Sequence, residues 1–479
     1  MGFDRILSPK QKALEINLNS RIYGTFAEIG AGQETVRFFY RAGGASGTLA
    51  KAMSAYDKNF SDAIYGKEED GRYVTEKRLK KMLDHEMALI EERLNDEQYK
   101  DKLFFSYANT VTTIDFTKTS KGHGWVGIRF QADKTHKDYS EIIIHVNFKE
   151  NSAQLQQETL GVLGVNLIHS AYFHHDDPRK ILRSLYDSLE MDQLEIDAIN
   201  FSGPCFEYVD NRLMSLQLVK NHMTDAVIFG PNRKNFLPSD ILYKKNIFVM
   251  RGSFRPVTKV NMDILESCLE MFMKREGVNK DNTEVLFEIT LSNLAAEGEI
   301  DERDFLDRAD IIGNLGYKVL ISDFLEYYKL VDYFSEFTKD TDQIGLGMGV
   351  NSLFNIFNPK YYEDLAGGAM EAFGKLFKKN VIVYSYPYLD KESNVLLTSE
   401  NLEVNEKVSD LYKFFKSNHR IIDVRNYKPE HANIYSYKVL EQINNNEEGW
   451  EEYLPKEVTE LIKERGLFGY QSLAGKKIK

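Results

Sequence analysis

The stretch MRGSFRPVTK, residues 250–259, places three cationic side chains and two hydroxyl groups close together in the chain. It follows the apolar run NIFV, which is typical of a buried β-strand. Guanidinium groups donate paired hydrogen bonds to phosphate and carboxylate oxygens, and ligands of α/β proteins bind where strands end. We therefore expect Arg251, Ser253, Arg255 and Lys259 to bind a small-molecule anion. The alternative is that these cations pair with some of the 73 acidic residues elsewhere in the chain.

Polar side chains at the ends of other predicted strands are candidates to complete this site. Asn200, Ser202 and Asn351 are further candidate substrate ligands, and Glu288 and Asp323 are candidate catalytic residues. Two carboxylates on successive strands could act as acid and base or could hold Mg²⁺, the one cofactor that the sequence suggests. Each of these residues, taken alone, is more often an ordinary cap or turn residue.

The glycine-rich stretch EIGAGQETVRFFYRAGGASG, residues 28–47, is a second candidate for anion binding. A glycine turn that leads into a helix points free backbone N–H groups at an anion. The candidate residues there are Gly30, Gly32, Arg37 and Arg41. The spacing differs from known phosphate loops, because Thr35 stands where a third glycine is needed and no Gly-Lys-Ser/Thr follows. A packing turn is the more conservative interpretation.

Length and composition limit the class of protein. A chain of 479 residues suggests about two or three domains, and 42% hydrophobic with 28% charged residues is typical of a globular protein. The net charge of −12 argues against nucleic-acid binding through a basic surface. The sequence contains no apolar window of membrane-spanning length and no signal-peptide core near residue 1, and its two cysteines form no disulfide framework. We expect a cytoplasmic protein without a membrane partner.

Apolar strands alternate with helical segments over much of the chain, which predicts an α/β fold with a mainly parallel sheet. About eight strands are predicted, at 141–148, 194–201, 225–230, 246–252, 284–291, 318–323, 343–349 and 381–388. A (β/α)₈ barrel-like arrangement and an open, doubly wound sheet both remain possible.

The same pattern predicts three regions. They are a helical N-terminal region over 1–102, an α/β core over 103–400 that starts with a short strand meander, and a helical C-terminal appendage over 401–479.

Five segments resemble a family of bacterial cytosolic proteins of similar length, and the resemblance spans nearly the whole chain. The segments are RIYGTFAEIGAGQETVRFFYRAGGASGTLAKAMSAYD, LQQETLGVLGVNLI, NRLMSLQLVKN, RGSFRPVTKVNMD and EGEIDERDF. Members of the family carry two conflicting labels, nicotinate-nucleotide adenylyltransferase and TonB-dependent receptor. The first label implies a nucleotide substrate, but the H-x-G-H motif of nucleotidylyl transferases is missing, since Ser120 precedes KGHG. The second implies a membrane barrel, whose long series of alternating strands this sequence lacks.

We therefore expect a protein that binds a phosphorylated or nucleotide-like small molecule at the C-terminal edge of the sheet, as an enzyme would. The alternative is a non-enzymatic, homo-oligomeric assembly protein. In that case the amphipathic helix predicted over 74–94 and the helical C-terminal region would supply contacts between copies. The sequence leaves the reaction open, and with it the question of whether the protein is an enzyme.

Overall fold

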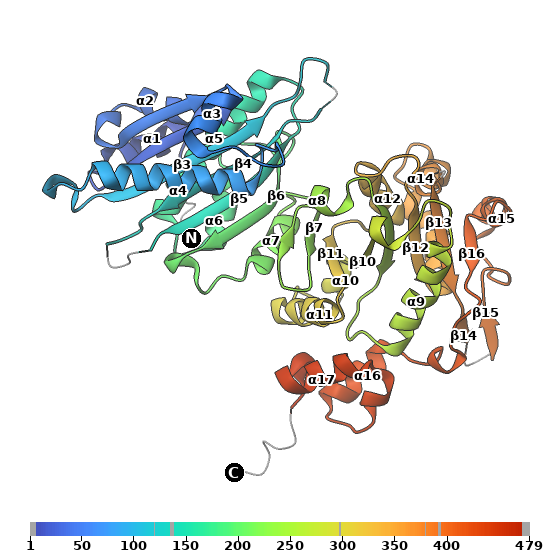
Figure 1. Cartoon of the computed structure of the whole chain (residues 1–479). Helices are drawn as coiled ribbons and strands as arrows, with labels where there is room; N and C mark the ends of the chain where they lie inside the picture. The colour runs from blue at the N-terminus through green and yellow to red at the C-terminus, as the bar shows by residue number, and fades with distance from the viewer. Residues whose placement is uncertain are drawn as a thin grey trace, which may run out of the picture. The chain divides into compact units, whose positions relative to one another are not determined.

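The computed structural model describes residues 6–118, 120–134, 138–296, 298–378, 380–390 and 394–471 (Figure 1). The chain forms two compact units, Met1–Thr224 (unit 1) and Asp225–Lys479 (unit 2). Each unit has its own sheet and its own covering helices, so the predicted α/β class is confirmed. The predicted boundaries at 102 and 400 do not coincide with this division, because strands on both sides of residue 102 pair in one sheet.

Unit 1 contains a six-stranded mixed sheet in the order β2-β1-β3-β4-β5-β6. The strands are β1 (Ile22–Gly30), β2 (Leu49–Ala55), β3 (Leu103–Thr112), β4 (His123–Phe130), β5 (Ser140–Phe148) and β6 (Leu194–Ser202). Strand β1 pairs in parallel with β2 and β3, whereas β3 to β6 are antiparallel neighbours. Strands β3 to β5 follow one another in the chain as antiparallel neighbours, and the region 1–102, predicted to be helical, contains β1 and β2.

Helices cover both faces of this sheet. They are α1 (Pro9–Leu18), α2 (Thr35–Ala42), α3 (Lys58–Tyr65), α4 (Glu76–Arg93), α5 (Ala153–Phe173), α6 (Pro178–Leu185) and α7 (Asn211–Lys220). Val126 and Ile128 of β4 pack in the core with Leu160 of α5. Gly127 lies between them in sequence and faces the opposite side, where α4 packs closely through Leu79. Helix α4 lies across that face (Figure 1).

Unit 2 contains an eight-stranded mixed sheet in the order β16-β13-β12-β9-β10-β11-β7-β8. The strands are β7 (Ala226–Phe229), β8 (Asn235–Phe236), β9 (Asn246–Arg251), β10 (Thr283–Thr290), β11 (Lys318–Ser322), β12 (Ile344–Gly349), β13 (Val381–Tyr386) and β16 (Ile421–Asp423). A separate pair is formed by β14 (Tyr388–Asp390) and β15 (Val395–Leu397). From β16 to β11 all neighbours are parallel, whereas β7 and β8 run antiparallel.

Both larger sheets are mixed, and the described strands close no barrel, so the mainly parallel or barrel-like arrangement was wrong. The physical reason is the length of the connections. A parallel crossover needs a dozen or more residues, usually with a helix, whereas an antiparallel neighbour needs only a short turn. The segment between β7 and β8 makes such a turn, and β3, β4 and β5 are antiparallel neighbours in chain order without a helix between them in the described residues.

The helices of unit 2 also cover two faces. They are α8 (Pro238–Leu242), α9 (Lys259–Met273), α10 (Leu291–Leu294), α11 (Glu302–Asn314), α12 (Tyr327–Ser335), α13 (Val350–Ile356), α14 (Gly368–Leu376), α15 (Ser409–Ser417), α16 (Ser436–Asn444) and α17 (Lys456–Arg465). Phe248 of β9 contacts Phe272 of α9, whereas Val249 faces the core that includes α12 and α14. The segment predicted as a helical appendage contains α15, α16 and α17 and also β16, which joins the sheet.

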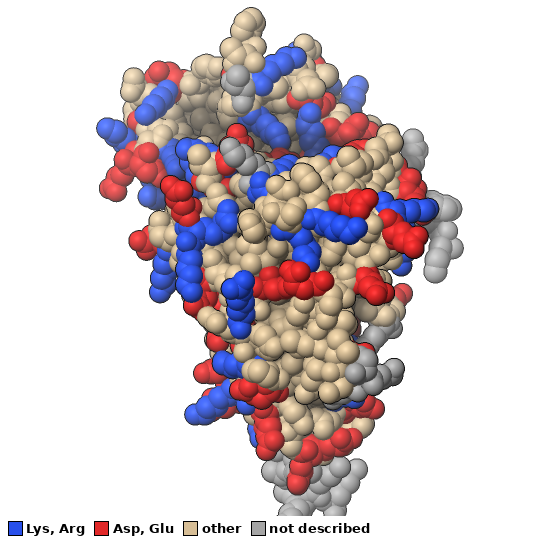
Figure 2. All heavy atoms as spheres, turned by 90° about the vertical axis from the view of Figure 1, so that its right-hand side faces the viewer, with Lys and Arg blue, Asp and Glu red and all other residues tan. Residues whose placement is uncertain are grey.

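The distribution of charge on the surface and the lengths of the helices are relevant to the predictions about nucleic-acid and membrane partners. Basic and acidic side chains are interspersed over the face that Figure 2 shows. No helix in the described part of the chain is long and apolar enough to cross a membrane. The predictions about nucleic acids and about homo-oligomers remain predictions.

Close packing of α9 on β12 leads to a first prediction. A Cβ atom at Gly345 would lie 2.7 Å from a ring carbon of Phe272 and 2.8 Å from one of Phe248. We expect Gly345→Ala to lower the free energy of unfolding by about 1–3 kcal/mol, as overpacking of cores does. Urea titration followed by fluorescence measures this change.

Gly374 provides the matched control, because it lies in α14 of the same unit and a Cβ there meets nothing within 4 Å. Gly374→Ala should stabilise the helix by about 0.5–1 kcal/mol. Equal effects of the two substitutions would contradict the packing argument.

Candidate functional site

The predicted anion ligand Arg251 forms an ion pair with the predicted catalytic residue Glu288 where β9 and β10 lie side by side. The Nε and Nη2 atoms of Arg251 donate to the two carboxylate oxygens at 2.8 and 2.9 Å. Ser322 Oγ donates to the same carboxylate at 2.7 Å, and Arg251 Nη1 donates to the Leu325 carbonyl at 3.0 Å. The guanidinium carbon lies 4.3 Å from the Tyr327 ring centroid. Glu288 is fully buried, so the pair is an internal one.

Burial and charge act against each other at Arg251. Burial, the largest single influence, lowers the pKa of Arg251, but the charge and hydrogen bonds of Glu288 outweigh it, and the net result is a raised pKa. Arg251 therefore keeps its positive charge, and this charge is neutralised by Glu288 within the sheet. Both oxygens of Glu288 are engaged in the same way, which leaves this carboxylate poorly placed to act as a base or to hold Mg²⁺.

The other cations of the 251–259 segment also have partners within unit 2. Arg255 pairs with Asp304 of α11, which also binds Arg308. Arg308 donates to the carbonyl oxygen of Ser253 at 3.2 Å, so the loop after β9 is tied to α11. Lys259 starts α9 and donates to the Glu452 carbonyl at 2.7 Å. Arg251 and Arg255 therefore pair with acidic residues of the chain, as the alternative interpretation of this segment has it.

The structure does not bring all predicted residues together. Asp323 and Asn351 are exposed, after β11 and at the start of α13. Asn200 and Ser202 lie on β6 of unit 1, in a different sheet from Arg251, and the Asn200 side chain accepts a hydrogen bond from Asn211 at 2.8 Å. A single sheet edge that carries all of them does not form, because the strand over 194–202 pairs with the meander of unit 1.

The glycine-rich stretch over 28–47 holds a carboxylate of its own at the start of α2. The backbone N–H groups of Thr35 and Val36 donate to the Glu28 carboxylate at 3.1 and 3.2 Å. These are the donors that an anion at a helix N-terminus would use. A Cβ at Gly32 would lie 2.2 Å from the Oδ1 atom of Asn109, which gives this glycine a packing role.

The remaining candidates of this stretch follow the same pattern. Gly30 adopts a left-handed backbone with φ of 79°, where glycine is favoured. Arg37 pairs with Glu34 at 2.7 Å on the surface, and Arg41 is exposed in the last turn of α2. The stretch is therefore an internally satisfied turn around the buried Glu28.

Glu28 is the buried acid whose titration is most clearly altered. Burial raises the pKa of Glu28 to about 7, although hydrogen bonds from Val36, Thr35 and Asn109 oppose this shift. Thr35 Oγ1 and the Tyr107 hydroxyl lie 3.0 Å apart beside it. The Oδ1 atom of Asn109 is buried without a hydrogen-bond partner. A 180° rotation of this amide would turn that oxygen toward a protonated Glu28.

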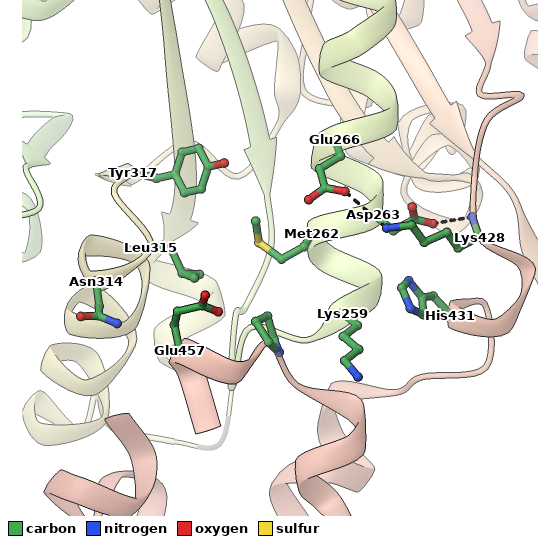
Figure 3. A pocket seen from close by; sticks show the side chains of 11 residues that line it. Lys259, Met262, Asp263, Glu266, Asn314, Leu315, Tyr317, Lys428, His431 and Glu457 are labelled. Atoms are coloured by element: carbon green, nitrogen blue, oxygen red, sulfur yellow. Dashed lines mark hydrogen bonds and ion pairs between the residues drawn. The ribbon is translucent and has the colours of Figure 1, made fainter. Parts of the chain in front are cut away.

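A pocket of about 670 Å³ lies in unit 2 beside α9; we call it the α9 pocket (Figure 3). Lys259 and Met262 line it from α9, and Leu315 and Tyr317 line it from the turn between α11 and β11. His431 ends the 3₁₀ turn Pro429–His431 in the C-terminal segment. Figure 3 shows the turn after α11 on one side of the pocket, the segment with His431 on the other and α9 between them.

The acids around the α9 pocket differ in how far they are engaged. The buried carboxylate of Asp263 accepts hydrogen bonds from the Tyr386 hydroxyl at 2.5 Å and from the Lys428 backbone N–H at 2.8 Å. Glu266 lies 3.5 Å from Lys428 Nζ, and both side chains are more than half exposed, so this pair contributes little. The Nδ1 atom of His431 is buried and has no hydrogen-bond partner in the described structure.

Sequence reasoning identified Lys259 and missed Lys428 and His431, which also line the pocket. Both come from the tetrapeptide KPEH, far from α9 in the chain. Neither lies at a spacing typical of a ligand motif, and only the fold places them beside Lys259. In the described residues no group of three or more His, Cys, Asp or Glu is arranged to hold a metal ion.

No model of a known protein family and no curated protein matches the chain. Among solved structures, it is similar to a competence-damaged protein (CinA) superfamily protein from Enterobacter cloacae, with 10% identity and a TM-score of 0.26 over 36% of this chain and 96% of that one. A competence or damage-inducible protein from Enterobacter asburiae gives 12% identity and a TM-score of 0.25 over 34% and 95%.

The buried ion pair leads to a prediction about stability. Glu288→Gln leaves the Arg251 guanidinium buried without a counter-charge, so we expect a loss of about 3–5 kcal/mol in the free energy of unfolding. The control is Glu270→Gln, which breaks an exposed pair between Glu270 of α9 and Lys274 just beyond that helix and should leave this energy nearly unchanged. Urea titration of both variants decides; similar small losses would show that the buried pair is not important for stability.

Glu28 leads to a prediction about pH. Its pKa in the folded protein, about 7, lies above the ordinary value of 4.5, so the folded state binds the proton more tightly. This contribution to stability is fully present below pH 4.5 and is lost as the pH rises through 7; it amounts to roughly 3 kcal/mol. Glu28→Gln should therefore remove a fall in unfolding free energy that the wild type shows between pH 4.5 and 7.5.

The pH dependence is measured by urea titration at several pH values. Glu34→Gln, a change at the surface of the same turn, should retain the wild-type dependence. A Glu28→Gln curve parallel to the wild type would contradict the assignment.

Proposed function

We propose that unit 2 binds a phosphorylated, nucleotide-like small molecule in the α9 pocket. The observation that carries this proposal is that the pocket has two lysines, Lys259 and Lys428, in its lining. Asp263 and Glu266 lie beside them, and Met262, Leu315 and Tyr317 form an apolar side. The pocket volume of about 670 Å³ lies within the usual range of small-molecule sites, about 300–1,000 Å³.

The two lysine side chains suit a phosphate group. Lys259 lies in the first turn of α9, where the helix dipole also favours an anion. The Lys259 ammonium has further donors beyond its bond to the Glu452 carbonyl. Lys428 is exposed at the rim, and His431 lines the same pocket. Together the two ammonium groups offer one anionic group several charge-assisted hydrogen bonds.

The apolar side suits a flat ring. Met262, Leu315 and Tyr317 are half-buried around this part of the pocket. The amide of Asn314 and the carboxylate of Glu457 supply hydrogen-bond partners at its edge. A heterocycle with N–H groups and ring nitrogens would therefore find both contact surface and polar partners.

The proposal keeps the predicted ligand class and changes the residues that bind it. Of the predicted ligands only Lys259 lines the α9 pocket. Asp263 is held by Tyr386 and Lys428, so the proposal is for binding and assigns no reaction. We propose, as before, that the protein is cytosolic and that its partner is a small-molecule anion.

Binding is tested by titration calorimetry of the full chain with AMP, ADP, adenosine and inorganic phosphate. We expect AMP or ADP to bind more tightly than adenosine or phosphate alone, because each of these occupies only one side of the pocket. Lys259→Ala and Lys428→Ala should each weaken binding about tenfold. Lys274→Ala, which removes an exposed lysine just beyond the other end of α9, should leave the affinity unchanged. Failure of the wild type to bind any nucleotide at millimolar concentration, or an equal loss with Lys274→Ala, would overturn the proposal.

A further inference from the structure

Unit 1 carries a cluster of two histidines and an aspartate that the predicted anion site does not involve. His123 lies on β4, His145 on β5 and Asp197 on β6, three neighbouring strands of the sheet (Figure 1). Strand alternation places His123 on the same face as Gly127, the face on which α4 packs. We call these three residues the two-histidine cluster.

The orientation of His145 is fixed from two sides. Its Nδ1 atom lies 2.6 Å from Asp197 Oδ1, and Asn147 Nδ2 donates to the other carboxylate oxygen at 2.9 Å. The Trp125 ring packs against the imidazole with centroids 4.9 Å apart. His145 and Asp197 are 3% and 8% exposed. Because Nδ1 faces Asp197, the Nε2 atom of His145 lies on the side of the ring that points away from this carboxylate.

The Nε2 atom faces a nitrogen of the second histidine. His145 Nε2 and His123 Nδ1 lie 3.3 Å apart. Two nitrogens bound at about 2.0–2.1 Å to one tetrahedral ion lie about 3.3–3.4 Å apart, so the observed separation matches the bite of a zinc-type ion. A carboxylate that accepts the other N–H of a metal-binding histidine is the usual outer partner in such sites.

We propose that His123 Nδ1 and His145 Nε2 together bind a divalent transition-metal ion such as Zn²⁺, with Asp197 orienting His145. Water would complete the coordination, since the described residues offer no third His, Cys, Asp or Glu in a metal-binding group. The site is therefore an open one, unlike the closed four-ligand sites that hold zinc for structural reasons.

The exposure of His123 suits this role. Its side chain is half-buried, whereas His145 is buried, so His123 lies on the more accessible side of the pair. With its proton on Nε2, the His123 side chain can present Nδ1 to the ion.

The full chain is titrated with ZnCl₂ by calorimetry and with Co²⁺ by visible absorption, which reports the coordination geometry. We expect one site that His123→Ala and His145→Ala each abolish, and that Asp197→Asn weakens about 10–100-fold. His175→Ala is the control. His175 belongs to the segment HHDDP of unit 1, outside the two-histidine cluster, so this substitution should leave binding unchanged. His123→Gln changes only a half-buried side chain, so it retains the fold and still tests the site if the His145 variant fails to fold.

Two results would overturn the proposal. One is the absence of Zn²⁺ and Co²⁺ binding to the wild type at millimolar metal. The other is binding that persists in His123→Ala and His123→Gln. Either would show that the contact between the imidazoles is only an N–H···N hydrogen bond, in line with the hydrogen bond between His145 and Asp197.

Discussion

The rest of the structure depends on one constraint: a charged group that enters the interior must find its partner there. Both sheets contain such groups. Glu288 is neutralised by Arg251 at the end of β9, and Glu28 is held by the first N–H groups of α2. Glu86 of α4, fully buried, pairs with Lys51 of β2 at 2.7 Å. These pairs tie strands to neighbouring strands and helices, and the helices cannot shift without leaving a charge unpaired.

The same constraint decides where ligands can bind. A cation that already serves a buried acid has little left for an anion in solution, which applies to Arg251 and Arg255. The residues that the two proposals assign as ligands lie around the α9 pocket and in the two-histidine cluster. Lys259 and Lys428 line the first, and His145 Nε2 and His123 Nδ1 lie 3.3 Å apart in the second.

Much of unit 2 could be predicted because its strands are buried on both faces and appear as continuous apolar runs. The strands near 225, 246, 284, 318, 343 and 381 were all found. Strand β1 was not predicted as part of a sheet, because Thr25 and Glu28 interrupt its apolar pattern. Both are buried, and their hydrogen bonds go to Glu86 and to α2. In the sequence alone, a buried polar residue of a strand cannot be distinguished from a loop residue, because its hydrogen-bond partner lies elsewhere in the chain.

The sequence by itself determined the α/β class, the positions of most strands and the concentration of cations over 251–259. Only the tertiary structure decided which acids these cations meet and which residues surround a pocket. Arg251 meets Glu288 across 37 positions, and the histidine of KPEH lines the α9 pocket with Lys259. The physical reason is that strand propensity follows from local apolar patterns, whereas charge compensation depends on distance in space. Residues far apart in the chain carry no local mark of the partner that neutralises them.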